Sequence, residues 1–141
     1  MAAVRHNAAE FSKRMEVIAE GVVENVAKTV RKAALAVDQV AVTTTPVDTG
    51  RARANWLTSV GSPSNHTVPS PGPGSAGQQA IAQGQSVIGA WKGGPIFITN
   101  NVEYVVPLDK GSSAQAPSGM TAAALQAGRK VVEDARVLPR K

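Results

Sequence analysis

Hydrophobic residues recur at steps of three and four between residues 8 and 42, which is the pattern of one amphipathic helix. Asn7 and Glu10 fit a capping box at its start, and Glu24 and Lys28 are spaced to form an ion pair. At ~1.5 Å per residue this helix would be roughly 50 Å long, more than a small domain needs to cover its own sheet. We therefore expect part of the apolar stripe to face a neighbouring subunit; the alternative is that all of it packs on the domain's own sheet. The stripe consists of Phe11, Met15, Ile18, Val22, Val26, Val30, Ala33, Val37 and Val40.

The segment TTTPVDTGRARANWLTSV, which follows this helix, changes from helix to strand character. Pro46 ends the helical pattern, since the residue before a proline avoids helical backbone angles. Asp48 and Gly50 are typical turn residues, because the first accepts backbone N–H bonds and the second tolerates a positive φ. Alternating side chains then predict a strand over residues 52–60, with Trp56 on its buried side.

Three further extended segments and a closing helix are predicted in the second half of the chain. Strands are expected at residues 86–91 and 95–100, joined by a Gly-containing turn, and a third extended segment at Glu103–Leu108. A helix is expected from about Pro117, because small and apolar residues again recur at helical spacing.

Residues 61–86 differ in composition from the rest of the chain, being rich in Gly, Pro, Ser and Gln. Such a segment buries too little apolar area to offset the entropy of ordering, so we expect a long mobile loop with one short helical turn near Gln78–Gln83. The whole chain, residues 1–141, reads as a single domain. The predicted fold is α+β: a long N-terminal helix, an antiparallel sheet of three to four strands with a long mobile loop, and a C-terminal helix.

Composition predicts a small core that would gain from assembly. Hydrophobic residues make up 43% of the 141 residues, but much of this is Ala and Val, and aromatic residues are only 4%. A core of small residues often gains stability from neighbouring chains. The absence of cysteine excludes disulfides and fits a reducing compartment, and neither a signal peptide nor a membrane span is expected. The expected large core residues are Phe11, Trp56, Trp91, Phe97 and Tyr104.

The net charge of +5 comes from 15 basic and 10 acidic residues that are spread along the chain. The spread favours solubility and a few partner contacts, and the alternative is nucleic-acid binding. Arg51, Arg53 and Trp56 can be read in the same two ways. They form either a basic stacking surface for nucleic acid, or a core tryptophan beside arginines that pair with acids across a subunit boundary.

No pattern in the chain points to catalysis. The two histidines, His6 and His66, are far apart, so no metal site is predicted, and no nucleophile turn of the G-x-S-x-G type occurs. Glu103 and Asp109 are either an acid pair or partners of Lys110 or of a neighbour's arginine. We expect no enzymatic activity, no metal and no cofactor.

Two stretches together resemble the tail-completion proteins of long-tailed bacteriophages, the family of minor tail protein Z and its neck-protein relatives. They are TPVDTGRARANW, residues 45–56, and FITNNVEYVVPLDKGSSAQAPSGM, residues 97–120. The chain departs from the family pattern at Ala52 and Val105, and at Asp109, where a glutamate is usual. The matching residues are Pro46, Val47, Asp48, Thr49, Gly50, Arg53, Thr99, Asn100, Asn101, Tyr104, Leu108, Gly111, Ser113, Gln115, Ala116, Pro117, Gly119 and Met120.

The resemblance implies a structural virion protein that forms a ring, most often a hexamer, in the phage neck. Such a ring joins the head-closure protein to the tail terminator protein and surrounds the channel through which DNA passes without sequence recognition. The implied locations are the virion and, during assembly, the cytoplasm of the bacterial host, with no membrane partner. The alternatives are a tail terminator that caps the tail tube and a basic DNA-binding accessory protein; a hydrolase is a weaker third.

The resemblance also implies which residues meet a neighbouring subunit or partner. Asn100 and Asn101 would turn the chain, and Tyr104 would anchor the next segment on the core. Gly111–Gly119 would let backbone approach backbone at the ring interface. The full set of expected interface residues is Asp48, Thr49, Gly50, Arg51, Arg53, Asn100, Asn101, Tyr104, Asp109, Lys110, Gly111, Ser113, Gln115, Pro117 and Met120, with Asp109 and Lys110 facing the neighbour.

Overall fold

The computed structural model describes residues 2–136 and, within them, the side chains of residues 7–136. The protein is mostly helical, with one short two-stranded antiparallel sheet among the described residues. Its elements are α1 (Ala2–Thr44), α2 (Arg51–Ala54), β1 (Leu57–Val60), α3 (Ala76–Gly89), β2 (Ile96–Thr99), α4 (Val105–Asp109) and α5 (Thr121–Glu133).

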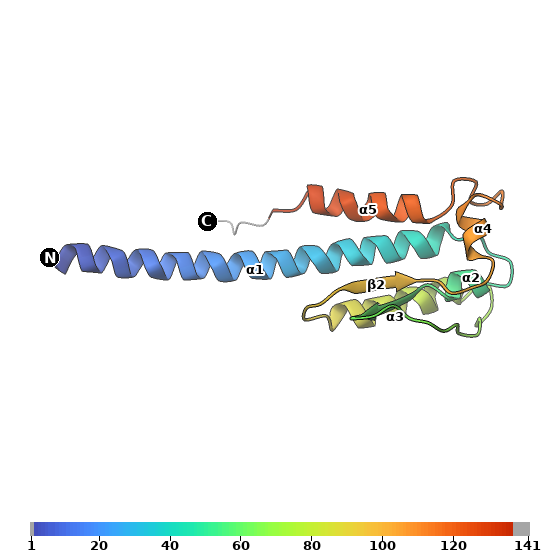
Figure 1. Ribbon diagram of the computed structural model, residues 1–141, viewed down its shortest axis with the longest axis horizontal. Helices are drawn as coiled ribbons and strands as arrows, with labels where there is room; N and C mark the ends of the chain where they lie inside the picture. Colours follow the sequence, from blue (N-terminus) through green and yellow to red (C-terminus); the bar gives the residue numbers. More distant parts are fainter. Residues whose placement is uncertain (1, 137–141) are drawn as a thin grey trace.

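The helix α1 is the axis on which the other elements pack (Figure 1). The helix α5 runs back along one side of its C-terminal half, and α3 with the β1–β2 sheet lies along the other side. The short helices α2 and α4 and their loops gather at the end of the rod, and the N-terminal half of α1 projects alone. The long helix is thus confirmed, but it begins at Ala2, so Asn7 lies inside it and is not its cap. The Glu24–Lys28 ion pair is confirmed at 3.1 Å.

The predicted sheet of three to four strands is wrong. In the described chain the sheet has two antiparallel strands, with Leu57 opposite Thr99 and Val60 opposite Ile96. The strand expected at residues 95–100 is confirmed as β2, whereas residues 86–89 are the last turn of α3. The α3 helix buries every fourth residue against α1 and β1, and this helical period overrides the short alternation at its end. Its buried residues are Ala76, Ala80, Gly84 and Ile88.

The predicted mobile loop over residues 61–86 is also wrong. Its second half belongs to α3, and its first half is held by hydrogen bonds to neighbouring segments. The Asn55 side chain exchanges two bonds with the backbone of Val68, at 2.7 and 3.0 Å, and the Asn101 amide donates to Ser64 O at 2.8 Å. Backbone groups that lack helix or strand partners are therefore paired by two asparagine side chains.

Two other expected strands are short helices. Residues 51–54 form α2 directly after Gly50, whose φ of 85° turns the chain, and only residues 57–60 of the expected strand are extended. The segment expected as Glu103–Leu108 forms α4 instead. Pro107 is compatible with this helix because it lies in the first turn, where backbone N–H groups have no helical partner in any case.

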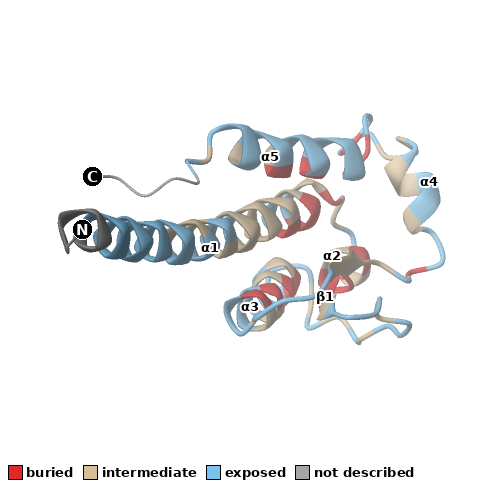
Figure 2. Ribbon diagram, turned by 60° about the vertical axis from the view of Figure 1, so that its left-hand side comes forward, coloured by how far each residue is buried: buried red, intermediate tan, exposed pale blue. Residues whose placement is uncertain are grey.

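The core lies where the C-terminal half of α1 meets α5, α3 and the two-stranded sheet (Figure 2). Trp56 is buried there, and its indole N–H donates to Thr45 Oγ1 at 2.7 Å. The expected core roles of Phe11 and Tyr104 are wrong, since these side chains are 65% and 40% exposed. The other core residues are Ala41, Val42, Ala80, Ala116, Met120 and Ala124.

Candidate functional site

The two sequence stretches that resemble the phage family meet at the end of the rod, opposite the N-terminus of α1. They enclose an open pocket of about 480 Å³. The turn before α2 forms one wall, and α4 with the loop that follows it forms the other. The pocket is lined by Pro46, Val47, Asp48, Thr49, Gly50, Arg51, Ala52, Tyr104, Leu108, Ser113 and Gln115.

Gln115 ties the two walls of this pocket together. Its side-chain oxygen accepts from Val47 N at 3.0 Å, and its amide nitrogen donates to Val47 O at 3.3 Å. Gly50 closes the floor, because a Cβ there would lie 2.9 Å from both Ala76 Cβ and Ser70 Oγ. The turn at residues 46–50 is therefore fixed by backbone packing and by one glutamine from a segment 68 residues away.

Arg51 and Glu103 form an ion pair at the rim of the pocket. Two guanidinium nitrogens contact the two carboxylate oxygens at 2.6 and 3.1 Å, which is the bidentate geometry. This hydrogen bonding lowers the pKa of Glu103 and raises that of Arg51. The guanidinium also lies 6.0 Å from the centre of the Tyr104 ring. Arg51 thus pairs with an acid of its own chain, and the pairing across a subunit boundary stays a prediction.

Arg53, by contrast, pairs with no acid among the described residues. Its guanidinium donates to the carbonyl oxygens of Thr45 at 2.8 Å and Thr43 at 3.2 Å, which are at the C-terminal end of α1. A cation there interacts favourably with the unpaired carbonyls of the helix end. Arg53 therefore caps α1.

Asn100 and Asn101 turn the chain after β2, as predicted. Asn100 Oδ1 accepts from Val102 N at 3.2 Å, and its amide donates to Ala52 O at 2.8 Å. Asn101 binds the loop at Ser64, as described above. The side chains of both asparagines thus form hydrogen bonds within the chain.

Asp109 caps α5, and its contact with a neighbouring subunit stays a prediction. Its Oδ1 accepts from Met120 N at 2.9 Å and Thr121 N at 2.8 Å. These backbone donors hold the pKa of Asp109 below its usual value. Two glycines with positive φ make the turn possible: a Cβ on Gly111 would overlap Pro117 O, and one on Gly119 would overlap Asp109 O. The close backbone approach expected of this small-residue run thus occurs within the loop itself.

The expected interface residues divide by exposure. Met120 is fully buried in the core and Gly50 is buried beneath the pocket, so neither presents a surface to a partner in this conformation. The expected residues that remain exposed around the two walls are Asp48, Thr49, Asn101, Tyr104, Lys110, Gln115 and Pro117. The half-buried ones are Arg51, Arg53, Asn100, Asp109, Gly111 and Ser113.

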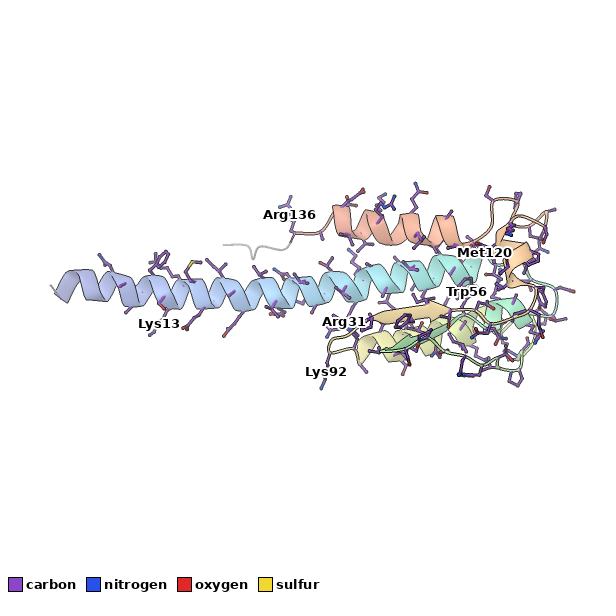
Figure 3. The ribbon with its side chains drawn as sticks, viewed as in Figure 1. Lys13, Arg31, Trp56, Lys92, Met120 and Arg136 are labelled. Atoms are coloured by element: carbon purple, nitrogen blue, oxygen red, sulfur yellow. The ribbon has the colours of Figure 1, made fainter. Side chains whose placement is uncertain are left out.

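The N-terminal half of α1 is a second exposed region. Every residue from 7 to 20 is exposed, including Phe11, Met15 at 48% and Ile18 at 40%. Figure 3 shows the side chains around Lys13 pointing away from the helix with no other element beside them, whereas Arg31 and Trp56 lie where α1 is covered. The Arg31 guanidinium marks the boundary, because it donates to Trp91 O at 2.9 Å and lies 5.6 Å from the Trp91 ring centre.

Sequence analysis missed the buried carboxyl group of Asp38. Asp38 is fully buried between α1, α3 and β1, and neither of its oxygens has a hydrogen-bond partner among the described residues. Burial raises its pKa to about 7; the nearby Thr58 hydroxyl, which makes no well-oriented hydrogen bond to it, offsets only part of this effect. The sequence contained one sign of this burial. Asp38 lies one helical turn from Ala34, Ala41 and Val42, so these residues form a second apolar face on α1 that includes the carboxyl group.

The described part of the chain offers no group of three or more His, Cys, Asp or Glu side chains that could hold a metal ion. Within the same residues, no helix is long and apolar enough to cross a membrane. The chain matches no protein-family model, no curated protein and no solved structure.

Proposed function

We propose that the protein is a structural component of a bacteriophage virion that forms a ring in the neck, most simply a hexamer. The ring joins the head-closure protein to the tail terminator protein and surrounds the channel through which DNA leaves the head. The observation that carries this proposal is the exposed apolar stripe on the N-terminal half of α1, which no other part of the described chain covers.

A closed ring of identical subunits requires two different surfaces on each subunit. Two exposed surfaces of the described chain lie at opposite ends of its long axis: the bare half of α1 and the pocket between residues 45–56 and 97–120. The bare half exposes Phe11 and Val17 by 65% and 66%, which is a costly arrangement for an isolated soluble chain. Such exposure supports assembly as the working state of the protein.

The pocket supports a contact with protein better than a reaction. Its arginine is already paired with Glu103, and the tyrosine ring lies beside that pair. The other groups that line it are the carboxylate of Asp48, the amide of Gln115, two hydroxyls and short apolar side chains, and no histidine or cysteine lies among them. Arginine and tyrosine set in a rim of this kind are typical of protein interfaces.

Electron microscopy of a lysate from phage that lacks this gene tests the proposal. Full heads beside separate tails of normal length are the expected result, and a plasmid copy of the wild-type gene should restore joining. Overlong or ragged tails would identify a tail terminator instead. Intact infectious particles would overturn the neck role, and duplex binding that weakens steeply with salt would then favour the DNA-binding alternative.

Complementation with two variants, each of which shortens an exposed side chain, tests the pocket. Tyr104→Ala removes a pocket side chain that is 40% exposed, and Val106→Ala removes one that is 57% exposed on the same helical segment outside the pocket. We expect Val106→Ala to restore joining and Tyr104→Ala to restore it poorly. Equal restoration by both variants would remove the pocket from the interface.

A further inference from the structure

The exposed half of α1 carries a seven-residue repeat in addition to its helical stripe. Apolar residues alternate at steps of three and four from Ala8 to Val22, and the next position is Asn25. This spacing averages 3.5 residues, which is the period that keeps one face of a helix against another helix in a coiled coil. We call this face the α1 seam; it consists of Ala8, Phe11, Met15, Ile18, Val22 and Asn25.

The α1 seam continues a helix–helix interface that the chain already makes. Further along α1, α5 packs so closely that a Cβ on Gly128 would lie 2.5 Å from Val37 Cγ2 and 3.6 Å from Ala33 O. Val37 and Ala33 belong to the same apolar stripe as Phe11 and Ile18. The covering helix α5 ends at Glu133, and the small pocket at its end is lined by Lys28 and Thr29 of α1 among others. From there to the N-terminus the stripe has no helix over it.

We propose that the α1 seam packs in parallel against the same seam of neighbouring copies of this chain, as a coiled coil. A helix with the matching period is the partner that this face fits, and every copy of the chain supplies one. The parallel sense rests on the proposed ring, because copies related by rotation about one axis place α1 in the same direction relative to that axis.

The residues that flank the seam are compatible with parallel self-pairing. We assign Ala8, Met15 and Val22 to position a of the heptad. In a parallel coiled coil, each g residue of one helix lies opposite the e residue of the following heptad in its partner, which is five residues further along the sequence. These pairs are Asn7 with Ser12, Arg14 with Ala19 and Gly21 with Val26, so no two like charges are opposed. Of these residues, Ala19 and Val26 also widen the apolar face on one side of the seam, which suits a bundle in which each helix touches more than one neighbour.

Disulfide trapping tests the seam and its direction, because the natural chain has no cysteine. Ala8→Cys and Val22→Cys place one thiol each at two seam positions that are about 21 Å apart along the helix. Mild oxidation of the full-length variants should link Ala8→Cys to itself and Val22→Cys to itself. Val17→Cys and Val23→Cys are controls, since these residues are 66% and 69% exposed but lie off the seam, and they should link much less.

Oxidation of a mixture of the Ala8→Cys and Val22→Cys variants distinguishes a parallel arrangement of the helices from an antiparallel one. An antiparallel pair would bring position 8 of one chain near position 22 of the other, so the mixed species would dominate and would overturn the parallel proposal. No linking above the level of the off-seam controls would overturn the seam as a self-contact, and a helix of another protein would then be its partner.

Charge insertion provides an independent measurement by sedimentation of the full chain. Ile18→Glu, on the seam, should abolish self-association, whereas Val17→Glu, one position off the seam, should leave it intact. A wild-type chain that stays monomeric at its solubility limit, or equal effects of both variants, would overturn the proposal. Both side chains are exposed in the single chain, so neither change should unfold it, and circular dichroism checks this.

The cross-linking and gene-deletion experiments test the coiled coil and the neck role independently. Seam cross-links in a protein whose deletion leaves phage infectious would support the coiled coil and remove the proposed function. Separate heads and tails after deletion, with no seam cross-links, would support the neck role and remove the coiled coil.

Discussion

The carboxyl group of Asp38 on α1 lies directly against Gly84 on α3, with no room between them for another carbon atom. A Cβ on Gly84 would lie 2.9 Å from Asp38 Cγ and 3.2 Å from Thr58 Oγ1, and it would overlap Asp38 Oδ2. Both residues are buried. The close packing of α1 on α3 at this point therefore depends on the absence of a side chain at position 84.

Gly84→Ala should destabilise the protein by up to about 2 kcal/mol, because overpacking in a core typically costs about 1 to 3 kcal/mol and alanine in a helix recovers about 1 kcal/mol of it. Urea unfolding measures the difference. Gly89→Ala is the matched control, because a Cβ there meets nothing within 4 Å, and it should be neutral or mildly stabilising.

The double variant Asp38→Ala with Gly84→Ala should recover most of this loss, since removal of the carboxyl group makes space for the new methyl group. The two changes are then strongly non-additive, as is expected of residues in direct contact. Additive effects, or a Gly84→Ala protein as stable as the Gly89→Ala control, would contradict the packing described here.

Asp38 should make the stability of the protein fall as the pH rises toward neutral. Burial raises the pKa of the Asp38 carboxyl group from its usual value of 3.8 to about 7. The folded chain therefore binds the carboxyl proton more tightly than the unfolded chain does. The stabilising contribution of this group is complete below the unfolded pKa and is lost as the pH rises through the folded pKa. From about pH 5 to about pH 8 the loss should be on the order of 2 to 3 kcal/mol, at ~1.4 kcal/mol per unit of pKa.

Within the described chain, the causes of this shift are burial and the Thr58 hydroxyl, with no contribution from another charged group. The sequences of α3, β1 and β2, which lie on this side of α1, contain no ionisable side chain, and the nearest polar group is Thr58. Asp38→Asn keeps the shape and removes the charge, so its unfolding free energy should vary much less over the same range. A wild-type curve that is flat, or that rises toward pH 8 and matches the curve of the Asn variant, would show that Asp38 is not buried in this way.

Asp109 should contribute to stability as the cap of α5. Asp109→Ala leaves the backbone N–H groups of Met120 and Thr121 without their acceptor and should cost about 1 kcal/mol, a typical value for such a cap. Asp109→Asn retains an acceptor oxygen and should cost less. Thermal unfolding compares the three proteins; if alanine and asparagine behave alike and like the wild type, the capping role is wrong and a partner contact regains weight.

The cap also predicts a pH effect of opposite sign to that of Asp38. The pKa of Asp109 is lowered on folding, so its contribution is present above its unfolded pKa and is lost as the pH falls through the folded value. This loss lies in the acid range, below the window in which Asp38 acts. The two carboxyl groups can therefore be distinguished by titration of stability alone.

The sequence predicted those features that depend on neighbours along the chain. The long helix follows from a stripe repeated over many turns, β2 from a short apolar run bounded by turn residues, and the Asn100 turn from the ability of its side chain to accept a nearby N–H. The two motif segments were also chosen from sequence, and they do meet around one pocket. The contacts of Arg51 and Asp109 with a neighbouring subunit stay predictions, although both side chains have partners in their own chain.

The helix α3 shows why the remaining fold could not be read from sequence. Its Gly, Gln and Ser content favours a loop, and its last residues alternate like a strand, so local preference argues against a helix. Burial of Ala76, Ala80 and Ile88 against α1 and β1 supplies the stabilisation that local preference lacks. That contribution exists only after segments distant in the sequence have packed together.

The sequence by itself thus determined the long helix, its apolar stripe and the two segments that form the pocket. Each of these features follows from the spacing of residue types within one stretch of the chain. Tertiary structure alone decided which half of the stripe is covered, because α5 is shorter than α1 and ends beside Lys28 and Thr29. It also decided that Asp38 would be buried, because the chain closes α3 and β1 over that carboxyl group. Burial of this kind depends on the arrangement of several elements at once, and no single stretch of sequence encodes it.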